Sequence, residues 1–409
     1  MQTTPKSLRI HIGIFGRTNV GKSSFLNMIA GQDVAITSSV PGTTTDVVEK
    51  SMELLPVGPV VFLDTAGVDD TSELGVLRIK KTSAAMDRSE VVVVVTEPQV
   101  WGAFETQIAD DANAKKLPVI VVVNKVDTDE VSKVWLDIVK KTTDRIIMCS
   151  SVGSMNRERY VSRFKAELMS ALPEERLTDP ALISDLIHPG GLAVLIVPID
   201  LQAPKGRLIL PQVQTIRDAL DCDAMSLVVK EREYSHVYSI LGKKPDLVIC
   251  DSQIVMKMVA DTPQDVPCTT FSILFSRYKG DLIEEVKGAA MIEKLRSGDK
   301  VLIAEACSHH AAEDDIGRVK IPRWLRQYTG IDLNVDIASG RDYPENLSEY
   351  KLVIHCGACM LTRKEKLVRI QKAREAGVAV TNYGIAISLL QGVLKRVLTP
   401  FPAALAVLK

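Results

Sequence analysis

The feature that most constrains this chain is a glycine-rich segment that joins an apolar strand to a helix. The apolar run Arg9–Phe15 leads into Gly-Arg-Thr-Asn-Val-Gly-Lys-Ser at residues 16–23, and a helical pattern follows over Ser23–Ala30. This is the G-x-x-x-x-G-K-[ST] pattern in the strand–loop–helix context that it requires. Its glycines let successive N–H groups face a phosphate at a helix N-terminus, which favours anions. The segment predicts a phosphate-binding loop in which Lys22 reaches the β- and γ-phosphates and the Ser23 hydroxyl binds magnesium.

Two further motifs follow apolar strands and specify the nucleotide. Asp64-Thr-Ala-Gly67 ends the run Val60–Leu63; there a carboxylate can hold magnesium through water, and the Gly67 N–H can sense the γ-phosphate. Asn124-Lys125-Val126-Asp127 ends the run Pro118–Val123. The Asp127 carboxylate can accept two hydrogen bonds from guanine, whereas adenine would leave it unmatched at a cost. The sequence therefore predicts GTP and not ATP.

The pattern of apolar runs predicts the architecture. From about Leu8 to Leu172, strand-like runs alternate with helical patterns, which predicts a mostly parallel sheet with helices on both faces. Prolines and acidic residues mark a linker near 173–180. A small second block and a third, again alternating block follow. We expect an α/β chain with a P-loop nucleotide domain, a small α/β domain and a C-terminal α/β domain, at residues 1–173, 181–262 and 263–409.

Charge and cysteine content restrict the function further. Lysine plus arginine number 50 and aspartate plus glutamate 51, a balance that makes a nucleic-acid partner unexpected. There is no signal-peptide pattern, and the longest apolar runs are far shorter than the roughly 20 residues of a membrane span. We therefore expect a cytoplasmic protein without a membrane partner, in which the 7 cysteines are thiols and any cluster of them binds metal or is catalytic.

Two groups of cysteine and histidine follow strands of the third block. Cys307-Ser-His309 comes after Lys300–Ala304, and His355-Cys356-Gly-Ala-Cys359 comes after Lys351–Ile354. The carboxyl ends of strands in an alternating α/β domain are the usual place for a ligand site. A structural zinc site with three cysteines and one histidine satisfies the spacing. A 4Fe–4S cluster on three cysteines satisfies it equally and leaves one iron with a different or exchangeable ligand.

The N-terminal motifs together resemble the translation-factor-related GTPases, particularly the tRNA-modification and ribosome-assembly members. In this resemblance Pro41–Asp46 is the first switch, and Thr44 binds magnesium when the γ-phosphate is present. Asn19 matches the asparagine that holds potassium in the potassium-dependent members. Val68 stands where Ras-like enzymes place a water-orienting glutamine, so we expect slow hydrolysis. Ser150-Ser151 matches the loop that closes over guanine O6.

The chain as a whole resembles the FeFe-hydrogenase maturation GTPases. The similarity rests on the cysteine–histidine pattern downstream of the GTPase motifs and on Val197–Asp200, Ala203–Gln214 and Thr381–Gly384. It implies a GTPase domain, a middle dimerisation domain and a C-terminal 4Fe–4S domain. It also implies a homodimeric scaffold or carrier that receives a di-iron precursor from radical-SAM maturases and delivers it to the apo FeFe-hydrogenase. The cluster ligands implied are Cys307, Cys356 and Cys359, with His309 and His355 as ligands or hydrogen-bonding neighbours.

The sequence thus predicts a slow, potassium-stimulated GTPase with a scaffold role, and its cofactors would be GTP, Mg2+, K+ and a 4Fe–4S cluster. One alternative is an RNA-modification-type GTPase with a structural zinc domain. Another is a metal-binding module in which the GTPase domain only stabilises the dimer. The expected catalytic residues are Lys22, Thr44 and Gly67. The expected nucleotide-binding residues are Asn19, Val20, Gly21, Lys22, Ser23, Ser24, Thr44, Asp64, Gly67, Asn124, Lys125, Asp127, Ser150 and Ser151.

Overall fold

The computed structural model describes residues 5–31, 48–65, 82–152, 156–172, 181–198, 208–306, 315–340, 343–344 and 346–408. The chain divides into two compact units, Met1–Asp179 and Pro180–Lys409, and each is described by itself. Among the expected site residues, those that lie outside the described residues are Thr44, Gly67, Cys307 and His309.

The first unit is built on a six-stranded sheet with strand order β2-β3-β1-β4-β5-β6. All neighbours in it pair in parallel except β2 and β3, which are antiparallel. The strands are β1 (Ile10–Phe15), β2 (Val48–Leu54), β3 (Gly58–Asp64), β4 (Val91–Thr96), β5 (Val119–Val123) and β6 (Ile146–Met148). The central strand β4 reads Val-Val-Val-Val-Val-Thr and is buried throughout, as a parallel strand covered on both faces must be.

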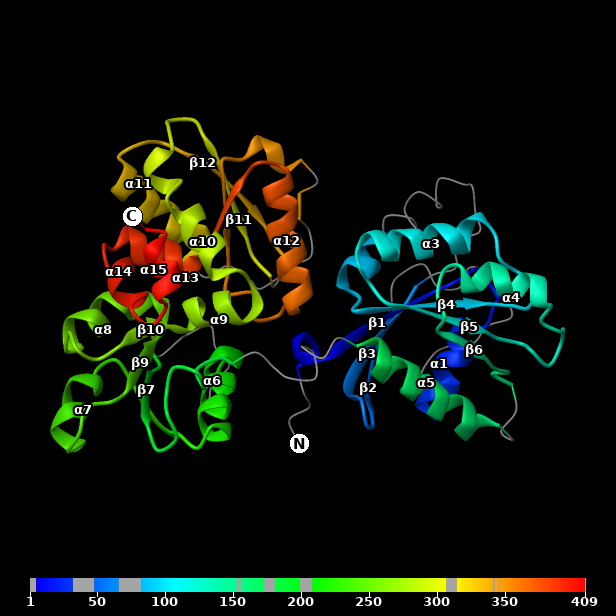
Figure 1. The fold of residues 1–409 in the computed structure, drawn as a ribbon. Helices are drawn as coiled ribbons and strands as arrows, with labels where there is room; N and C mark the ends of the chain where they lie inside the picture. The colour runs from blue at the N-terminus through cyan, green and yellow to red at the C-terminus, as the bar shows by residue number, and fades with distance from the viewer. Residues whose placement is uncertain are drawn as a thin grey trace. The chain divides into compact units, whose positions relative to one another are not determined.

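Helices cover both faces of this sheet (Figure 1). The helices are α1 (Lys22–Ala30), α3 (Ala103–Ala114), α4 (Lys133–Lys140) and α5 (Arg157–Ala171). On one face α1 and α5 meet through Phe25 and Phe164, whose rings make an edge-to-face contact at 5.3 Å. On the other face Ile108 of α3 and Trp135 of α4 lie in a separate apolar cluster. The mostly parallel, two-sided sheet agrees with the sequence prediction.

The second unit contains two four-stranded parallel sheets with orders β10-β9-β7-β8 and β12-β11-β13-β14. Their strands are β7 (Leu192–Ile196), β8 (Met225–Val229), β9 (Leu247–Cys250), β10 (Cys268–Thr270), β11 (Lys300–Ala304), β12 (Asn334–Ala338), β13 (Leu352–His355) and β14 (Ala379–Asn382). The first sheet runs to Thr270 and so continues past the boundary expected at residue 262. One apolar core joins the two sheets, with Leu195 from one and Ile354 from the other.

Helices of the second unit lie on both faces of the second sheet, β12-β11-β13-β14. On one face α12 packs Ile370 against Val353 and Val380, while α10 and α13 lie in contact with β14. The helices are α6 (Leu210–Asp221), α7 (Tyr234–Ile240), α8 (Val255–Asp261), α9 (Phe271–Lys279), α10 (Leu282–Ala289), α11 (Ile321–Thr329), α12 (Arg363–Glu375), α13 (Tyr383–Leu390), α14 (Leu394–Val397) and α15 (Pro402–Ala406).

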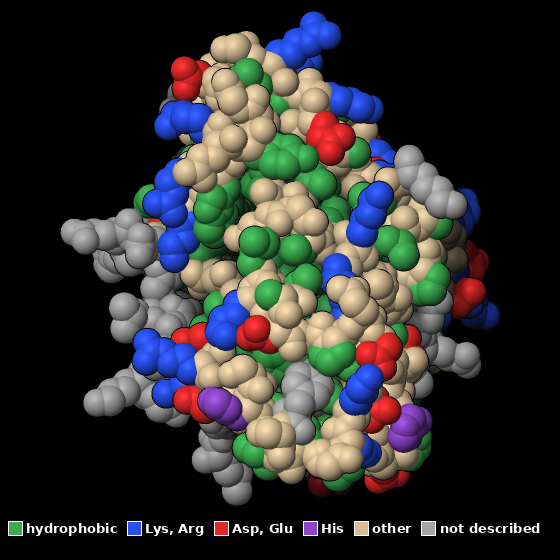
Figure 2. Space-filling view, turned by 90° about the vertical axis from the view of Figure 1, so that its left-hand side faces the viewer, with side chains coloured by type: hydrophobic (Ala, Val, Ile, Leu, Met, Phe, Trp, Pro, Cys, Tyr) green, Lys and Arg blue, Asp and Glu red, His purple; other side chains and the backbone are tan. Residues whose placement is uncertain are grey.

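The surface carries charges of both signs. On the face in Figure 2, lysine and arginine side chains are interspersed with aspartate and glutamate, and hydrophobic side chains lie between them. A stripe of one sign, which nucleic-acid binding favours, does not form on this face of the described chain. None of the described helices has both the length and the hydropathy to cross a bilayer.

Candidate functional site

The phosphate loop lies between β1 and α1, and the Lys22 side chain donates hydrogen bonds back to the backbone of the loop. Gly21 adopts a left-handed conformation (φ 89°) where α1 begins, and a Cβ built on it would lie 2.2 Å from Asn124 Nδ2. The buried Lys22 ammonium donates hydrogen bonds to the carbonyl oxygens of Gly16 (2.9 Å) and Arg17 (2.7 Å). The position therefore suits glycine alone, and the lysine charge lies within the loop where phosphates would bind.

The residues expected to hold magnesium are brought together at the same end of the sheet. The Ser23 hydroxyl donates to Asp64 Oδ2 over 3.2 Å. Burial raises the pKa of Asp64, against the opposing effects of Lys22 and Ser23. A buried carboxylate beside a hydroxyl is an oxygen donor set that suits a hard divalent cation. Ser23 and Asp64 therefore fit magnesium.

Asn124 connects the base-recognition segment to two other loops. Its side chain is 1% exposed, and Nδ2 donates to the Val20 carbonyl over 3.0 Å. Its Oδ1 accepts from the Ser151 N–H (3.0 Å) and from the Ser151 hydroxyl (2.9 Å). One amide thus ties the phosphate loop, the Asn-Lys-x-Asp motif and the Ser150-Ser151 loop into one site. The sequence identified these segments but gave no signal for this connection.

Lys125 and Asp127 complete the base side of the site. Lys125 has a positive φ (59°), and its Nζ donates to the Asn19 carbonyl over 2.8 Å and pairs with Glu97. The Ser150 hydroxyl lowers the pKa of Asp127. The exposed Asp127 side chain thus stays ionised at neutral pH, in the form that accepts hydrogen bonds from guanine.

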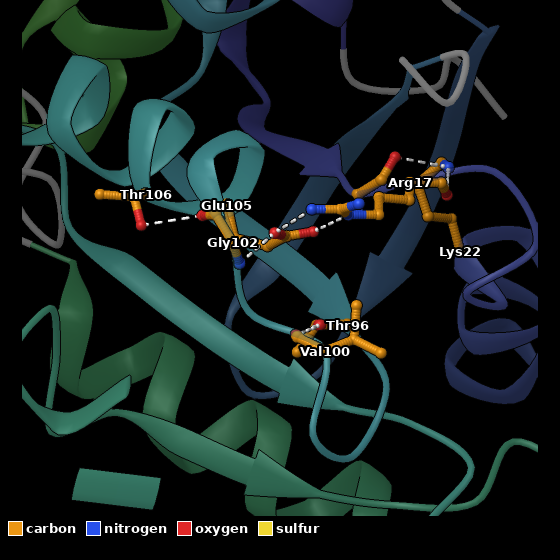
Figure 3. A network of polar contacts seen from close by, with 8 residues as sticks. Arg17, Lys22, Thr96, Val100, Gly102, Glu105 and Thr106 are labelled. Atoms are coloured by element: carbon orange, nitrogen blue, oxygen red, sulfur yellow. Dashed lines mark hydrogen bonds and ion pairs between the residues drawn. The ribbon is translucent and has the colours of Figure 1, made fainter. Parts of the chain in front are cut away.

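An ion pair between the half-buried Arg17 and the buried Glu105 fixes one side of the phosphate loop, as Figure 3 shows. Arg17 Nε donates to Glu105 Oε1 (2.7 Å), and a second guanidinium nitrogen donates to Oε2 (3.0 Å). The Gly102 N–H also donates to Oε2 over 2.9 Å. Glu105 is fully buried; desolvation opposes its charge, but Arg17 and Gly102 lower its pKa. Sequence reasoning missed this pair, because its members lie 88 positions apart.

The expected cysteine site lies at the carboxyl edge of the second sheet. β11 and β13 are parallel neighbours with Ala304 opposite His355. The Cys356 sulfur accepts from the N–H groups of Ala306 (3.1 Å) and Ala358 (3.4 Å). Ala306, whose N–H contacts the Cys356 sulfur, is the residue directly before Cys307 in the sequence.

Cys356 and Cys359 are both half-buried and free of disulfides, and burial raises the pKa of each. Two sulfurs spaced Cys-x-x-Cys, one of them facing N–H donors, fit a thiolate-bound metal centre. Among the described residues alone, no complete group of metal ligands is present.

The side chains of His355 and Asp315 differ in which of their atoms remain available to a ligand. The buried His355 ring stacks on Tyr343 at 5.6 Å, and burial keeps its pKa well below the usual range. Its Nε2 lies 3.4 Å from the Tyr343 hydroxyl, and Nδ1 has no hydrogen-bond partner in the described structure. The Asp315 carboxylate accepts from the Arg318 N–H (2.8 Å), so it caps a helical turn.

The cysteines without metal spacing lie elsewhere. Cys149, Cys250 and Cys268 are fully buried, and Cys222 is half-buried. Burial raises the pKa of Cys149 to about 12 and of Cys268 to about 11. The three buried cysteines behave as small apolar side chains.

Models of known protein families match three consecutive parts of the chain. Residues 11–125 match a family described as 50S ribosome-binding GTPase. Residues 182–280 match the hydrogen maturase F dimerization domain, and residues 283–400 match the hydrogen maturase F tetramerization domain. The first unit is thus a GTPase domain, and the second unit carries two oligomerisation domains of one family.

Similar proteins agree with the assignment of the GTPase domain. The tRNA modification GTPase MnmE of Synechococcus sp. (strain JA-3-3Ab) is 40% identical over 131 residues, which cover 31% of this chain and 28% of that protein. GTPase Era of Marinobacter nauticus is 33% identical over 187 residues, which cover 43% and 60%. The chain therefore spans less than two thirds of either relative.

A solved structure of Aquifex aeolicus Era bound to GDP.AlF4- is also similar. It is 20% identical, covers 54% of this chain and 91% of that one, and has a TM-score of 0.36. The matches to the two maturase domains are independent of this similarity. Since those two domains follow a GTPase domain in one polypeptide, the chain belongs to the hydrogen maturase F family of GTPases.

Proposed function

We propose that this GTPase is a scaffold and carrier for the di-iron subcluster of FeFe-hydrogenase. It would receive the precursor from radical-SAM maturases and deliver it to the apo-hydrogenase. One observation carries the proposal: a single maturase-family chain holds both a guanine-nucleotide site and a cysteine loop. The cysteine loop, Cys356–Cys359, follows β13 at the carboxyl edge of β11 and β13. The first supplies a switch, and the second supplies a place for a metal–sulfur group.

In the GTPase step, the residues of the chain bind and orient the nucleotide. Lys22 leaves the Gly16 and Arg17 carbonyls for the phosphates, and Asp127 reads guanine. Ser23 and Asp64, with Thr44, would hold magnesium, which neutralises charge on the phosphates. Gly67 would sense the γ-phosphate, and water would convert GTP to GDP and phosphate.

Asn19 would hold potassium beside the phosphates. Its side chain is exposed at the phosphate loop, where an amide oxygen can reach a cation. Replacing K+ with Na+ should then lower GTP turnover in the parent, and Asn19→Ala should abolish the difference. Equal turnover of the parent in both salts would refute the potassium site.

Cys356 and Cys359 of the cysteine loop, together with Cys307, would hold a 4Fe–4S cluster. Such a cluster leaves one iron with an exchangeable position, which suits a carrier that must take up and release cargo. His355 would be a ligand through Nδ1 or a hydrogen-bonding neighbour, and His309 would have one of the same two roles. Asp315 is a weaker candidate for the remaining position, because its carboxylate already caps a helical turn.

GTP binding would bias two switch segments, Pro41–Asp46 and Gly67–Gly75, and so alter contacts with a maturation partner. Lys22→Ala and Asp127→Ala should therefore abolish hydrogenase activation while leaving cluster content unchanged. Intact activation by both variants would refute the switch role.

The primary experiment is anaerobic iron–sulfur reconstitution, followed by metal analysis and EPR. The parent should take up about four irons per chain, and the Cys307/Cys356/Cys359 triple alanine variant should take up none. Cys222→Ala is the matched control, because Cys222 is half-buried and lies outside the loop. Tightly bound zinc without a cluster would instead support the structural-zinc reading. That reading with an RNA partner is not favoured, because the maturase domains match both parts of the second unit.

The assembly is a further part of the proposal. The homodimer expected from the sequence is consistent with the dimerization domain at 182–280, and the tetramerization domain at 283–400 adds a second association step. Light scattering at several protein concentrations would separate dimer from tetramer, and a monomer at all of them would refute both.

A further inference from the structure

Three cationic side chains are buried near the Cys356–Cys359 loop. Lys279 at the end of α9 is 1% exposed, and Lys366 and Arg369 on α12 are 0% and 7% exposed. The two helices pack against each other. Lysine and arginine are almost never buried to this degree unless their charge is compensated. Each of these three charges therefore requires compensation.

Lys366 has a conventional partner. Its Nζ lies 2.8 Å from Glu285 Oε1, and both side chains are fully buried. Glu285 also accepts a hydrogen bond from Asn382 Nδ2 over 2.9 Å. The charge of Lys366 is therefore balanced within the core, and this pair adds no net positive charge near the loop.

Lys279 forms no ion pair with a carboxylate among the described residues, although the charge of Glu365 acts on it. Its Nζ donates instead to the carbonyl oxygens of Cys359 (3.0 Å) and Leu361 (2.8 Å). These bonds fasten the cysteine loop to α9. Carbonyl oxygens satisfy the N–H groups but do not neutralise the charge, and an uncompensated buried charge is costly.

Arg369 is the second cation without a carboxylate partner in the described structure. It donates to the Gly340 carbonyl over 2.8 Å, and its guanidinium lies 5.0 Å from the centre of the Tyr343 ring. Tyr343 stacks on His355, the residue before Cys356. Arg369 therefore approaches the cysteine loop from the Tyr343 side, while Lys279 holds the loop at Cys359.

We propose that Lys279 and Arg369 form a fixed positive support for an anionic metal–sulfur centre on the cysteine loop and raise its reduction potential. The inference rests on the proposed 4Fe–4S cluster and adds the residues that tune it. Thiolate ligands make such a centre anionic, and reduction adds a further negative charge. Fixed cations in a dry site stabilise the reduced form more than the oxidised form. Glu365 supplies some counter-charge to both side chains, and the loaded centre would supply more.

The test is an EPR-monitored redox titration of the reconstituted full-length protein. Lys279→Met keeps the approximate length of the side chain and removes its charge, and Arg369→Leu removes the charge of the second cation with a shorter apolar side chain. Each should shift the midpoint potential to more negative values, by about tenfold in the reduction equilibrium, or ~59 mV for one electron. Lys279→Arg should keep the parent's potential, and Lys287→Met on the exposed face of α10 is the matched control.

The outcomes separate the inference from the proposed function. A parent that takes up no iron would overturn the proposed cluster and this inference with it. A parent cluster whose potential is unchanged in both charge-removal variants would overturn the inference alone. If Lys279→Met loses iron because its loop is no longer held, Arg369→Leu decides, since it leaves both hydrogen bonds of Lys279 in place.

Discussion

Replacing Asn124 with alanine tests whether the three nucleotide loops form one site. The side chain is buried and makes hydrogen bonds of 2.9–3.0 Å to Val20 and Ser151. Alanine removes these bonds and leaves the Val20 carbonyl and the Ser151 N–H without their partner. The phosphate loop and the loop after β6 would then be free to move apart.

The magnitude follows from the number and kind of these bonds. A neutral hydrogen bond contributes about 1 kcal/mol net, and leaving buried partners unsatisfied adds to the loss. Three bonds give about 3 kcal/mol, which is divided between folding stability and nucleotide binding. If about 2 kcal/mol falls on binding, the Kd for GDP rises about 30-fold.

The assay is titration of a fluorescent GDP analogue, with thermal melting of the same samples. Asn113→Ala is the matched control, since Asn113 is exposed on α3 of the same unit. The control should bind GDP as the parent does. If Asn124→Ala lowers the melting temperature but leaves the Kd within twofold of the parent value, Asn124 is only a core residue and the reasoning fails.

Three further changes test other parts of the structure. Gly21→Ala should weaken GTP binding by more than tenfold in the same titration, because its Cβ would lie 2.2 Å from Asn124 Nδ2 at a φ of 89°. Glu105→Gln should destabilise the protein at pH 7. Because the pKa of Glu105 is lowered in the folded state, the stabilisation is present above the unfolded pKa of about 4.3 and is lost as pH falls through the folded value. The difference from the parent in urea unfolding should therefore shrink below about pH 4. Thr362→Ala should cost about 1 kcal/mol in the same assay, since the Thr362 hydroxyl caps α12 by accepting from Glu365 N–H.

Much of the first unit could be predicted from the sequence because its signals are local. The run Val91–Val95 can only be a buried strand, and the glycine-rich loop fixes where β1 ends and α1 begins. The strand β2 was missed because Val-Glu-Lys-Ser-Met-Glu-Leu lies at the sheet edge, where half-exposed positions carry polar residues. Its antiparallel pairing with β3 is not visible in the alternation that predicts parallel strands.

The extent of the first sheet in the second unit depended on contacts that no local pattern reports. β10 has only three residues and follows Pro263 and Pro267, so it reads as a loop. It becomes a strand because Cys268 and Thr270 pair with Val248 and Cys250 of β9. The boundary expected at residue 262 therefore divides strands that belong to one sheet.

At the candidate cysteine site, the expected ligands could be predicted from the sequence, but the residues that surround them could not. Cys356 and Cys359 are recognisable because metal ligation requires a fixed spacing of particular atoms. Lys279 and Arg369 carry no such signal, since a lysine or arginine on a helix is usually solvated. Only the packing of α9 against α12 reveals that they are buried beside the loop. Candidate ligands can thus be predicted from sequence, but the buried charges beside them depend on the fold. The redox titration of Lys279→Met therefore tests the effect of a charge that the fold places beside the loop, and not only the cysteine motif.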